Sequence, residues 1–300
     1  MMSHISEICR IDSLSPYYNF PVTTDVLRLD LVHPFVSGNK WFKLKEYIGE
    51  AKHNNKETLL TFGGAFSNHI VATAAAAEIN NFKSIGIIRG EVPVRLSPSL
   101  LDAQNFGMEL FFTSREDYKH KKKPAAVYEK HDEEGIYMIP EGGYGIKGAT
   151  GATSILQSNE TRSYSHIISA VGTGTTLAGI VTAANHTQTV IGIPALKNAF
   201  SLKQEIENLL PEEKLQAFTL MHDYHFGGYA KHTEGLLQFM NELYSKTGIP
   251  TDFVYTGKAF YAAFDLLNKN YFTSMDRLLI IHTGGLQGNR SLKKGTLIFD

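Results

Sequence analysis

Short apolar runs alternate with amphipathic segments along most of this chain, and this alternation constrains the fold more than any other feature. The predicted strands are 26–31, 58–62, 84–88, 108–112, 136–139, 165–171, 189–193, 217–221 and 277–281. Helices are predicted over 44–53, 67–79, 98–105, 147–157, 177–184, 233–244 and 258–268. Alternating strands and helices are typical of parallel sheets covered by helices. We therefore expect an α/β fold.

The composition limits the size and class of the protein. Its 300 residues, 43% of them hydrophobic, can bury sizeable cores and suit a two-lobed protein. The net charge of -1 does not point to nucleic acid or to an acidic membrane surface. No apolar run reaches the roughly 18 residues of a membrane span, and the charges within residues 1–12 do not fit a signal peptide.

Cysteine and histidine usage narrow the range further. The single cysteine, Cys9, excludes an internal disulfide framework and fits a reducing compartment, so a cytoplasmic protein is expected. The 12 histidines are scattered and lack the spacing of a metal site, so no metal is predicted.

Residues 37–45, SGNKWFKLK, contain three lysines, which we do not expect to have the same role. Lys40 follows a Gly-Asn turn and precedes the only tryptophan. Apolar neighbours would remove water from its ammonium group, which lowers its pKa and makes a free amine available. A free amine can form a Schiff base with an aldehyde cofactor. The alternative is that Lys40, Lys43 and Lys45 form an ordinary basic patch.

A second signal is a small-residue turn between the strand 165–171 and a helix. It consists of Gly172, Thr173, Gly174, Thr175 and Thr176. Backbone N–H groups of such a turn can converge on an anion, and the helix dipole assists them. The turn suits one phosphate group. It matches neither a Walker loop nor the dinucleotide pattern G-x-G-x-x-G, and a turn that binds nothing remains the alternative.

Three further turns at strand ends carry polar groups. Gly63 to His69 opens a helix, where Ser67 can serve as N-cap and Asn68 and His69 add donors for an anion or a ring oxygen. Tyr255 is followed by Thr-Gly-Lys and could stack on a flat ring, or could be an ordinary core residue. Thr283, in His-Thr-Gly-Gly, could bind a ring nitrogen, or could belong to a plain turn.

Together these turns fit one molecule. An aldehyde needs an amine, a phosphate needs converging donors, and an aromatic ring needs partners for its face and its nitrogen. Pyridoxal 5'-phosphate has all of these features. The turns also fall at strand ends, which is where open α/β sheets bind ligands.

Several segments resemble one family of enzymes: SGNKWFKLK, TFGGAFSNHIVATAAAA, IGIIRGE, AVGTGTT, VYTGKAF and HTGG. They are similar to the 1-aminocyclopropane-1-carboxylate deaminase/D-cysteine desulfhydrase family, in the tryptophan synthase β-like group (fold type II) of pyridoxal phosphate enzymes. The resemblance runs from about residue 27 to 285. It implies two open parallel-sheet α/β domains with the cofactor in the cleft between them. The smaller domain would span 43–148 and the larger 1–42 and 149–300.

The resemblance also implies roles for single residues. Lys40 would be the Schiff-base lysine, Asn68 would contact the ring hydroxyl, and Tyr255 would stack on the ring. The turn 172–176 would bind the phosphate. Ser67, Asn68 and His69 would surround the substrate carboxylate, although many relatives carry glutamine where His69 stands. Catalytic roles are implied for Ser67, Tyr255 and Tyr229, although the residues after Tyr229, Ala-Lys, depart from the family pattern.

Two threonines bear on the substrate. Cyclopropane-carboxylate deaminases resemble one another in a glutamate after the stacking tyrosine and a leucine in the later H-x-G-G block, where this chain has Thr256 and Thr283. We expect Thr283 to contact the ring nitrogen and Thr256 to contact the substrate. A threonine leaves that nitrogen uncharged and the ring a weaker electron sink, which suits elimination of a good leaving group. This is the D-cysteine desulfhydrase-like pattern.

The expected reaction is β-elimination from a small amino acid, with D-cysteine giving pyruvate, ammonia and sulfide. The alternatives are 1-aminocyclopropane-1-carboxylate deamination to 2-oxobutanoate, another D-amino acid such as D-serine or β-chloro-D-alanine, and a non-catalytic carrier of the cofactor. A plain nucleotide-binding module is a more distant alternative. The family resemblance suggests a homodimer.

Overall fold

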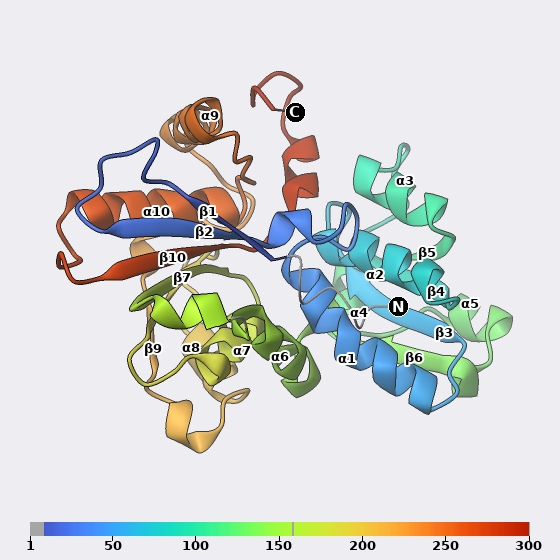
Figure 1. Cartoon of the computed structure of the whole chain (residues 1–300). Helices are drawn as coiled ribbons and strands as arrows, with labels where there is room; N and C mark the ends of the chain where they lie inside the picture. Colours follow the sequence, from blue (N-terminus) through green and yellow to red (C-terminus); the bar gives the residue numbers. More distant parts are fainter. Residues whose placement is uncertain (1–8, 158, 300) are drawn as a thin grey trace.

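The structure is a computed structural model that describes residues 9–157 and 159–299. Two open sheets lie side by side, each with helices packed on it (Figure 1). The first eight residues, part of the segment whose charges do not fit a signal peptide, lie outside the described residues. The expected α/β class with two sheets is confirmed.

The larger sheet has six strands in the order β1-β2-β10-β7-β8-β9. Only the pair of β1 with β2 is antiparallel among these strands, and the other pairs are parallel. The strands are β1 (Arg10–Ser13), β2 (Thr23–Arg28), β7 (His166–Val171), β8 (Thr189–Pro194), β9 (Phe218–Leu220) and β10 (Arg277–His282). Because β2 pairs with β10, segments from both ends of the chain lie side by side near the centre of this sheet.

The smaller sheet has four parallel strands in the order β5-β4-β3-β6. They are β3 (Thr58–Gly63), β4 (Lys83–Arg89), β5 (Met108–Thr113) and β6 (Ile136–Ile139). β3 is buried along its whole length, which is typical of a parallel strand with both faces covered.

Ten α-helices connect and cover the sheets in the described part of the chain. They are α1 (Asn39–His53), α2 (Asn68–Ile79), α3 (Pro98–Asn105), α4 (Arg115–Lys119), α5 (Ala125–Lys130), α6 (Ile146–Thr153), α7 (Thr175–Ala183), α8 (Leu202–Glu207), α9 (Glu234–Thr247) and α10 (Thr256–Asn268). None of the helices within residues 9–157 and 159–299 is long and apolar enough to cross a membrane.

Most predicted elements are confirmed to within a few residues, and the exceptions have local causes. The predicted strand 26–31 is β2, which ends at Arg28 because Leu29–Leu31 turn into a 3-10 helix. α1 begins at Asn39, five residues before the predicted start, because Gly38 forms the N-cap with a φ of 63°. The helix predicted over 147–157 ends as α6 at Thr153 and continues as a 3-10 turn.

Helix α6 lies between α1 and α7, in contact with both. The contacts are so close that only glycine fits. A Cβ atom on Gly151 of α6 would stand 2.2 Å from the carbonyl oxygen of Phe42 in α1. A Cβ atom on Gly179 of α7 would stand 2.5 Å from the carbonyl oxygen of Ala149 in α6. The backbones of the three helices therefore touch directly.

The predicted domain boundaries, after residues 42 and 148, fall inside α1 and α6. The strands of the smaller sheet all lie between these boundaries, and those of the larger sheet lie outside them. The division of the chain at residues 43 and 148 stays a prediction.

Candidate active site

The carboxyl ends of parallel strands from both sheets bring the predicted site residues together. The backbone N–H of Asn39 donates to the carbonyl oxygen of Thr283, 3.1 Å away, and its side-chain amide donates to Thr176 Oγ1 at 2.8 Å. Asn68 Nδ2 donates to the carbonyl oxygen of Gly285 at 3.0 Å. These bonds join the turns after β2, β3, β7 and β10 at the junction of the two sheets.

Lys40 lies in the first turn of α1, next to the turn that contains Thr283. A Cβ atom on Gly38 would stand 1.9 Å from the carbonyl oxygen of Thr283, so the two turns are in direct backbone contact. Lys40 Nζ donates to Asn39 Oδ1 at 3.1 Å. Burial lowers the pKa of Lys40 to about 8, although the negative charge of Asp252 opposes this shift. A free amine is therefore accessible near neutral pH.

Two further basic groups are buried close to Lys40. The side chain of Lys43 is only 2% exposed, so it is not the solvated lysine that a basic patch would contain. Burial, and then the charge of Lys40, holds the pKa of Lys43 well below its ordinary value. Burial and the charges of both lysines likewise hold the pKa of His69 well below 6.5. An anionic ligand bound beside these three groups would favour their protonated forms and oppose the lowering of their pKa values.

The N-terminus of α2 presents the residues expected at a carboxylate. Ser67 is the N-cap, and its Oγ accepts from the backbone N–H of Ile70 at 3.3 Å, as predicted. Asn68 Oδ1 is buried and has no hydrogen-bond partner among the described residues. His69 Nε2 lies 2.9 Å from the hydroxyl oxygen of Thr61, and its Nδ1 is buried without a partner in the described part of the chain. The free acceptor on Asn68 is suited to a hydroxyl group of a ligand.

The turn 172–176 leads directly into α7, as predicted. Gly174 has a φ of 79°, and Thr175 is the first residue of the helix. Thr173 Oγ1 lies 3.2 Å from Thr175 Oγ1. Thr176 Oγ1 accepts a hydrogen bond from Asn39, so its own hydrogen remains to be donated. The turn thus combines hydroxyl donors with the N–H groups and positive end of a helix.

Tyr255 and Tyr229 lie edge to face beside this turn. Their ring centroids are 6.0 Å apart at an interplanar angle of 67°. A Cβ atom on Gly172 would stand 3.0 Å from Cε1 of Tyr255, so the tyrosine ring rests against the start of the turn. Burial, and then the neighbouring Tyr229, raises the pKa of Tyr255 well above 10, which keeps its phenol protonated.

Thr256 is fully buried at the start of α10, and its hydroxyl is engaged by Asp252. Thr256 Oγ1 donates to Asp252 Oδ1 at 2.7 Å and accepts from the backbone N–H of Asp252 at 2.8 Å. The carboxylate of Asp252 also accepts from the N–H groups of Val254, Tyr255 and Thr256, each 2.8–2.9 Å away. Asp252 therefore caps α10 and fixes the backbone of Tyr255. The expected contact of Thr256 with a substrate stays a prediction.

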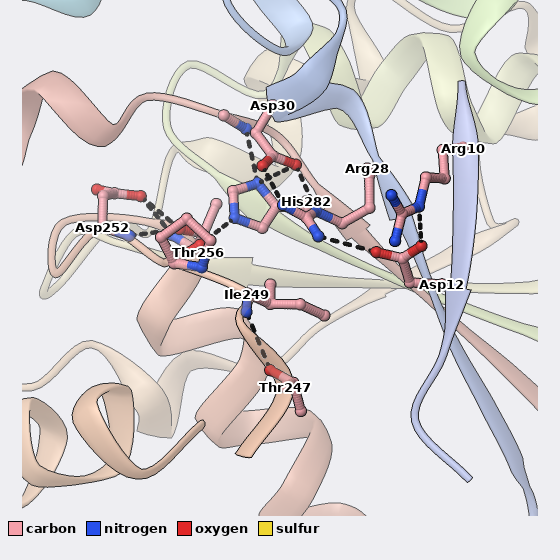
Figure 2. Close-up of polar contacts among 11 residues, drawn as sticks. Arg10, Asp12, Arg28, Asp30, Thr247, Ile249, Asp252, Thr256 and His282 are labelled. Carbon is pink, nitrogen blue, oxygen red and sulfur yellow. Dashed lines mark hydrogen bonds and ion pairs between the residues drawn. The ribbon is translucent and has the colours of Figure 1, made fainter. Parts of the chain in front are cut away.

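A chain of polar contacts joins Arg28 and Asp30 to His282, the last residue of β10 (Figure 2). Arg28 binds Asp12 at 2.9 Å and Asp30 at 2.6 Å. Asp30 Oδ1 lies 3.3 Å from His282 Nδ1, and His282 Nε2 lies 2.6 Å from the carbonyl oxygen of Pro250. Burial acts to raise the pKa of Asp30, but His282 and Arg28 outweigh it and lower the pKa. His282 thus ties the end of β10 to β2 and to the segment that leads into α10.

Sequence reasoning missed three residues of this region: Asp252, His282 and Lys258. Asp252 lies four residues before the start of α10, not at the N-cap position, so no simple pattern in the sequence marks it. His282 and Lys258 belong to the segments that contain Thr283 and Tyr255, but no role was predicted for either residue. Their burial depends on contacts with segments far away in the sequence.

Comparison with known proteins places this arrangement in context. The model of the family described as pyridoxal-phosphate dependent enzyme matches residues 9–284. A Pyrococcus horikoshii protein, provisionally named 1-aminocyclopropane-1-carboxylate deaminase, is 30% identical over 278 residues, 88% of this chain and 84% of its own. The mitochondrial bifunctional D-cysteine desulfhydrase/1-aminocyclopropane-1-carboxylate deaminase of Arabidopsis thaliana is 30% identical over 290 residues, 88% of this chain and 72% of its own. A crystal structure of a 1-aminocyclopropane-1-carboxylate deaminase homologue has a TM-score of 0.78 at 29% identity, covering 94% of this chain and 90% of its own.

Proposed function

The chain belongs to the pyridoxal-phosphate dependent enzyme family and is a lyase that uses this cofactor, and we propose that its substrate is a small D-amino acid, with D-cysteine the best candidate. One molecule of D-cysteine and one of water would give pyruvate, ammonia and hydrogen sulfide. The observation that carries the proposal is the buried amine of Lys40. Burial lowers its pKa to about 8, and the neighbouring Asn39 contacts the turn that suits a phosphate group.

The residues present fit the cofactor. Asn68 Oδ1 is a buried acceptor without a partner among the described residues, which suits the ring hydroxyl. The aromatic ring of Tyr255 rests against Gly172, at the start of a turn that suits a phosphate group. We infer that the following residues hold the cofactor: Lys40 its aldehyde, Asn68 its ring hydroxyl, Tyr255 its ring face, Thr283 its ring nitrogen, and Gly172, Thr173, Gly174, Thr175 and Thr176 its phosphate. When bound, the cofactor supplies an electron sink for the substrate carbon next to the nitrogen.

Lys40 acts as the general base in this proposal. Lys40 would hold the aldehyde of the cofactor in the absence of substrate, and as a free amine it would take the proton from the substrate's α-carbon. A pKa of about 8 suits this task, because the group is then deprotonated in a sizeable fraction of molecules near neutral pH. Asp252 moderates the shift from a distance and keeps the pKa from falling further.

The first turn of α2 binds the carboxylate of the substrate. Its backbone N–H groups and the positive end of the helix dipole favour an anion there. Ser67 and Asn68 add side-chain groups to the same turn, and the buried Lys43 and His69 lie close by. Tyr229 and Tyr255 lie beside the turn 172–176, where the protonated phenol of Tyr255 can donate a hydrogen bond or a proton.

Two threonines favour D-cysteine. A carboxylate at the ring nitrogen would keep that nitrogen protonated, whereas the hydroxyl of Thr283 leaves it uncharged. The carboxylate that lies nearby, Asp252, is already engaged by Thr256 and three backbone N–H groups. The weaker electron sink that results is sufficient for a good leaving group such as a thiolate.

A panel of substrates tests the proposal. We expect pyruvate and sulfide from D-cysteine at a higher kcat/KM than any keto acid from 1-aminocyclopropane-1-carboxylate, D-serine or L-cysteine, and pyruvate from β-chloro-D-alanine as well, because chloride is a good leaving group. Lys40→Ala should abolish both turnover and the visible absorbance of the bound cofactor. Wild-type rates of pyruvate formation in Lys40→Ala would refute the assignment of Lys40.

The second candidate is deamination of 1-aminocyclopropane-1-carboxylate to 2-oxobutanoate and ammonia. The names of the relatives from Pyrococcus horikoshii and Arabidopsis thaliana favour it. Release of 2-oxobutanoate without pyruvate from D-cysteine would select this reaction. A coloured protein that releases no keto acid from any member of the panel would indicate a carrier of the cofactor.

We also propose that the protein is a cytoplasmic homodimer. The single cysteine, Cys9, supports a reducing compartment, and the family resemblance supports the dimer. Light scattering of the purified protein tests the oligomeric state, and a mass of 33.3 kDa would identify a monomer.

A further inference from the structure

A third lysine, besides Lys40 and Lys43, is buried near the site and has no part in the chemistry described above. Lys258, in the first turn of α10, is fully buried. Its ammonium nitrogen donates to three backbone carbonyl oxygens: Gly228 at 2.8 Å, His225 at 2.9 Å and Ala195 at 3.4 Å. An ammonium group has three hydrogens to donate, so these carbonyls use all of them.

This position is an unfavourable one for a positive charge. The N-terminal end of a helix carries a partial positive charge, which repels a cation. Burial lowers the pKa of Lys258 to about 8, against the opposing charge of Asp252, and the group is still mostly protonated at neutral pH. An apolar side chain of similar volume, such as methionine, would fill the same space without this cost. Packing alone therefore does not account for the lysine.

The carbonyls that Lys258 binds belong mainly to a loop in a costly conformation. Four of the five residues from 226 to 230 have positive φ angles: Phe226 (50°), Gly227 (92°), Gly228 (115°) and Ala230 (53°). Left-handed backbone is unfavourable for a residue with a Cβ atom, such as Phe226 or Ala230. Such strain persists only where the surroundings impose it, and it is concentrated at functional sites.

The one residue of this stretch that keeps ordinary backbone is Tyr229. Its side chain is 48% exposed, so packing by itself does not fix its position, yet its ring lies against that of Tyr255. Lys258 lies three residues after Tyr255 on the same segment, and it binds the carbonyl that immediately precedes Tyr229. The third acceptor is the carbonyl oxygen of Ala195, whose own backbone N–H donates to the carbonyl oxygen of Val171, just before the turn 172–176, at 2.9 Å.

We propose that Lys258 is a positioning residue, whose ammonium group holds the strained loop 225–230 against α10 and so fixes Tyr229 beside Tyr255. The proposal rests on the proposed function in one respect, because it assumes that Tyr229 takes part in the reaction. The hold on the loop itself does not depend on which substrate the enzyme uses.

Hydrogen exchange of the purified holoenzyme tests the hold on the loop. In Lys258→Met, which keeps the length of the side chain and removes its donors, amides of residues 225–231 should exchange about tenfold faster or more than in the wild type. Lys269→Met is the matched control, because Lys269 follows the last residue of the same helix and forms an ion pair with Asp265 at the surface. Unchanged exchange of the loop in Lys258→Met would overturn the proposal.

Kinetics with the preferred substrate test the link to Tyr229. Lys258→Met should lower kcat on the order of 10²-fold, as expected for a misplaced catalytic group. If Lys258 acts through Tyr229, the double variant with Tyr229→Phe should be no slower than Tyr229→Phe alone. Losses that multiply would assign Lys258 a role independent of Tyr229 and refute the proposal.

If Lys258→Met does not fold, hydrogen exchange of the wild-type protein tests the proposal instead. Amides of the loop should then be as protected as those of the first turn of α10, because one ammonium group joins both. Exchange of the loop at the rate of an unstructured peptide would refute the proposal. Failure of the proposed function has a separate signature, since no member of the substrate panel would then give a product while the exchange results remain valid.

Discussion

Replacing Gly38 with alanine should separate the turn of Lys40 from the turn of Thr283. Two costs follow from the structure. Gly38 has a φ of 63° and a ψ of -139°, a sparsely populated conformation for a residue with a Cβ atom, which costs an alanine about 1–3 kcal/mol. The new Cβ atom would lie 1.9 Å from the carbonyl oxygen of Thr283 and would push the turns apart by roughly 1.5 Å, to an ordinary contact of 3.4 Å. The hydrogen bond from Asn39 to Thr283 is then lost, at about 1 kcal/mol.

The expected total is a loss of about 3 kcal/mol in the free energy of unfolding, which lowers Tm by about 6 °C at roughly 2 °C per kcal/mol. A displacement of Lys40 by about 1 Å should also lower kcat on the order of 10²-fold. Calorimetry and steady-state turnover measure the two effects. Gly49→Ala in the same helix is the control, because nothing lies within 4 Å of its Cβ position and the change should stabilise by about 0.5–1 kcal/mol. An unchanged Tm in Gly38→Ala would refute the reasoning.

Three other changes test separate parts of the site. The pKa of Lys40 is lowered from 10.5 to about 8 by folding, so the unfolded chain binds more protons between these values. The free energy of unfolding of the cofactor-free protein should rise with pH across this window, and Lys40→Met should make the rise smaller in denaturant titrations, while Lys258, whose pKa is lowered in the same way, still contributes. Gly172→Ala adds a Cβ atom 3.0 Å from the ring of Tyr255 and should weaken cofactor binding about tenfold by equilibrium dialysis, through displacement of that ring; an unchanged Kd would contradict the placement of the cofactor. Asp252→Ala removes the carboxylate that binds the N–H groups at the start of α10, and it should lower the free energy of unfolding by at least about 2 kcal/mol. It should also lower the pKa of Lys40 further, which the pH dependence of chemical labelling of Lys40 measures. A rise in that pKa would contradict the role of Asp252.

The parts of the fold that the sequence predicts are those with a repeating local signal. The strands Thr58–Gly63 and Ile136–Ile139 are short apolar runs that end at turn residues, and they were predicted to within one residue. Pro98 at the start of α3 marks that helix directly. The edge strand Arg10–Ser13 was missed, because only two of its four residues are even partly buried and its sequence is mostly polar.

The residues of the site likewise fall into those that a local sequence signal predicts and those that it does not. Ser67 could be recognised as an N-cap from its place before a helix, and the bond to Ile70 confirms it. The burial of Lys43 could not be predicted, because it involves contacts with segments far away in the sequence, such as the turn of Gly143, whose Cβ position is 3.2 Å from Lys43 Cε. The engagement of Thr256 by Asp252 was likewise hidden, since it depends on the path of the chain into α10.

The direct backbone contact of α6 with α1 and α7 has a mechanical consequence. Packed helices slide past one another when a layer of side chains between them can change rotamers. At Gly151 and Gly179 no such layer exists, so a sliding motion would force carbonyl oxygens into the opposing helix. We therefore expect the two sheets to respond to substrate as one stiff frame at this joint. Admission of the substrate to Lys40 then depends on local opening of the turns at the strand ends rather than on a swing of one lobe against the other.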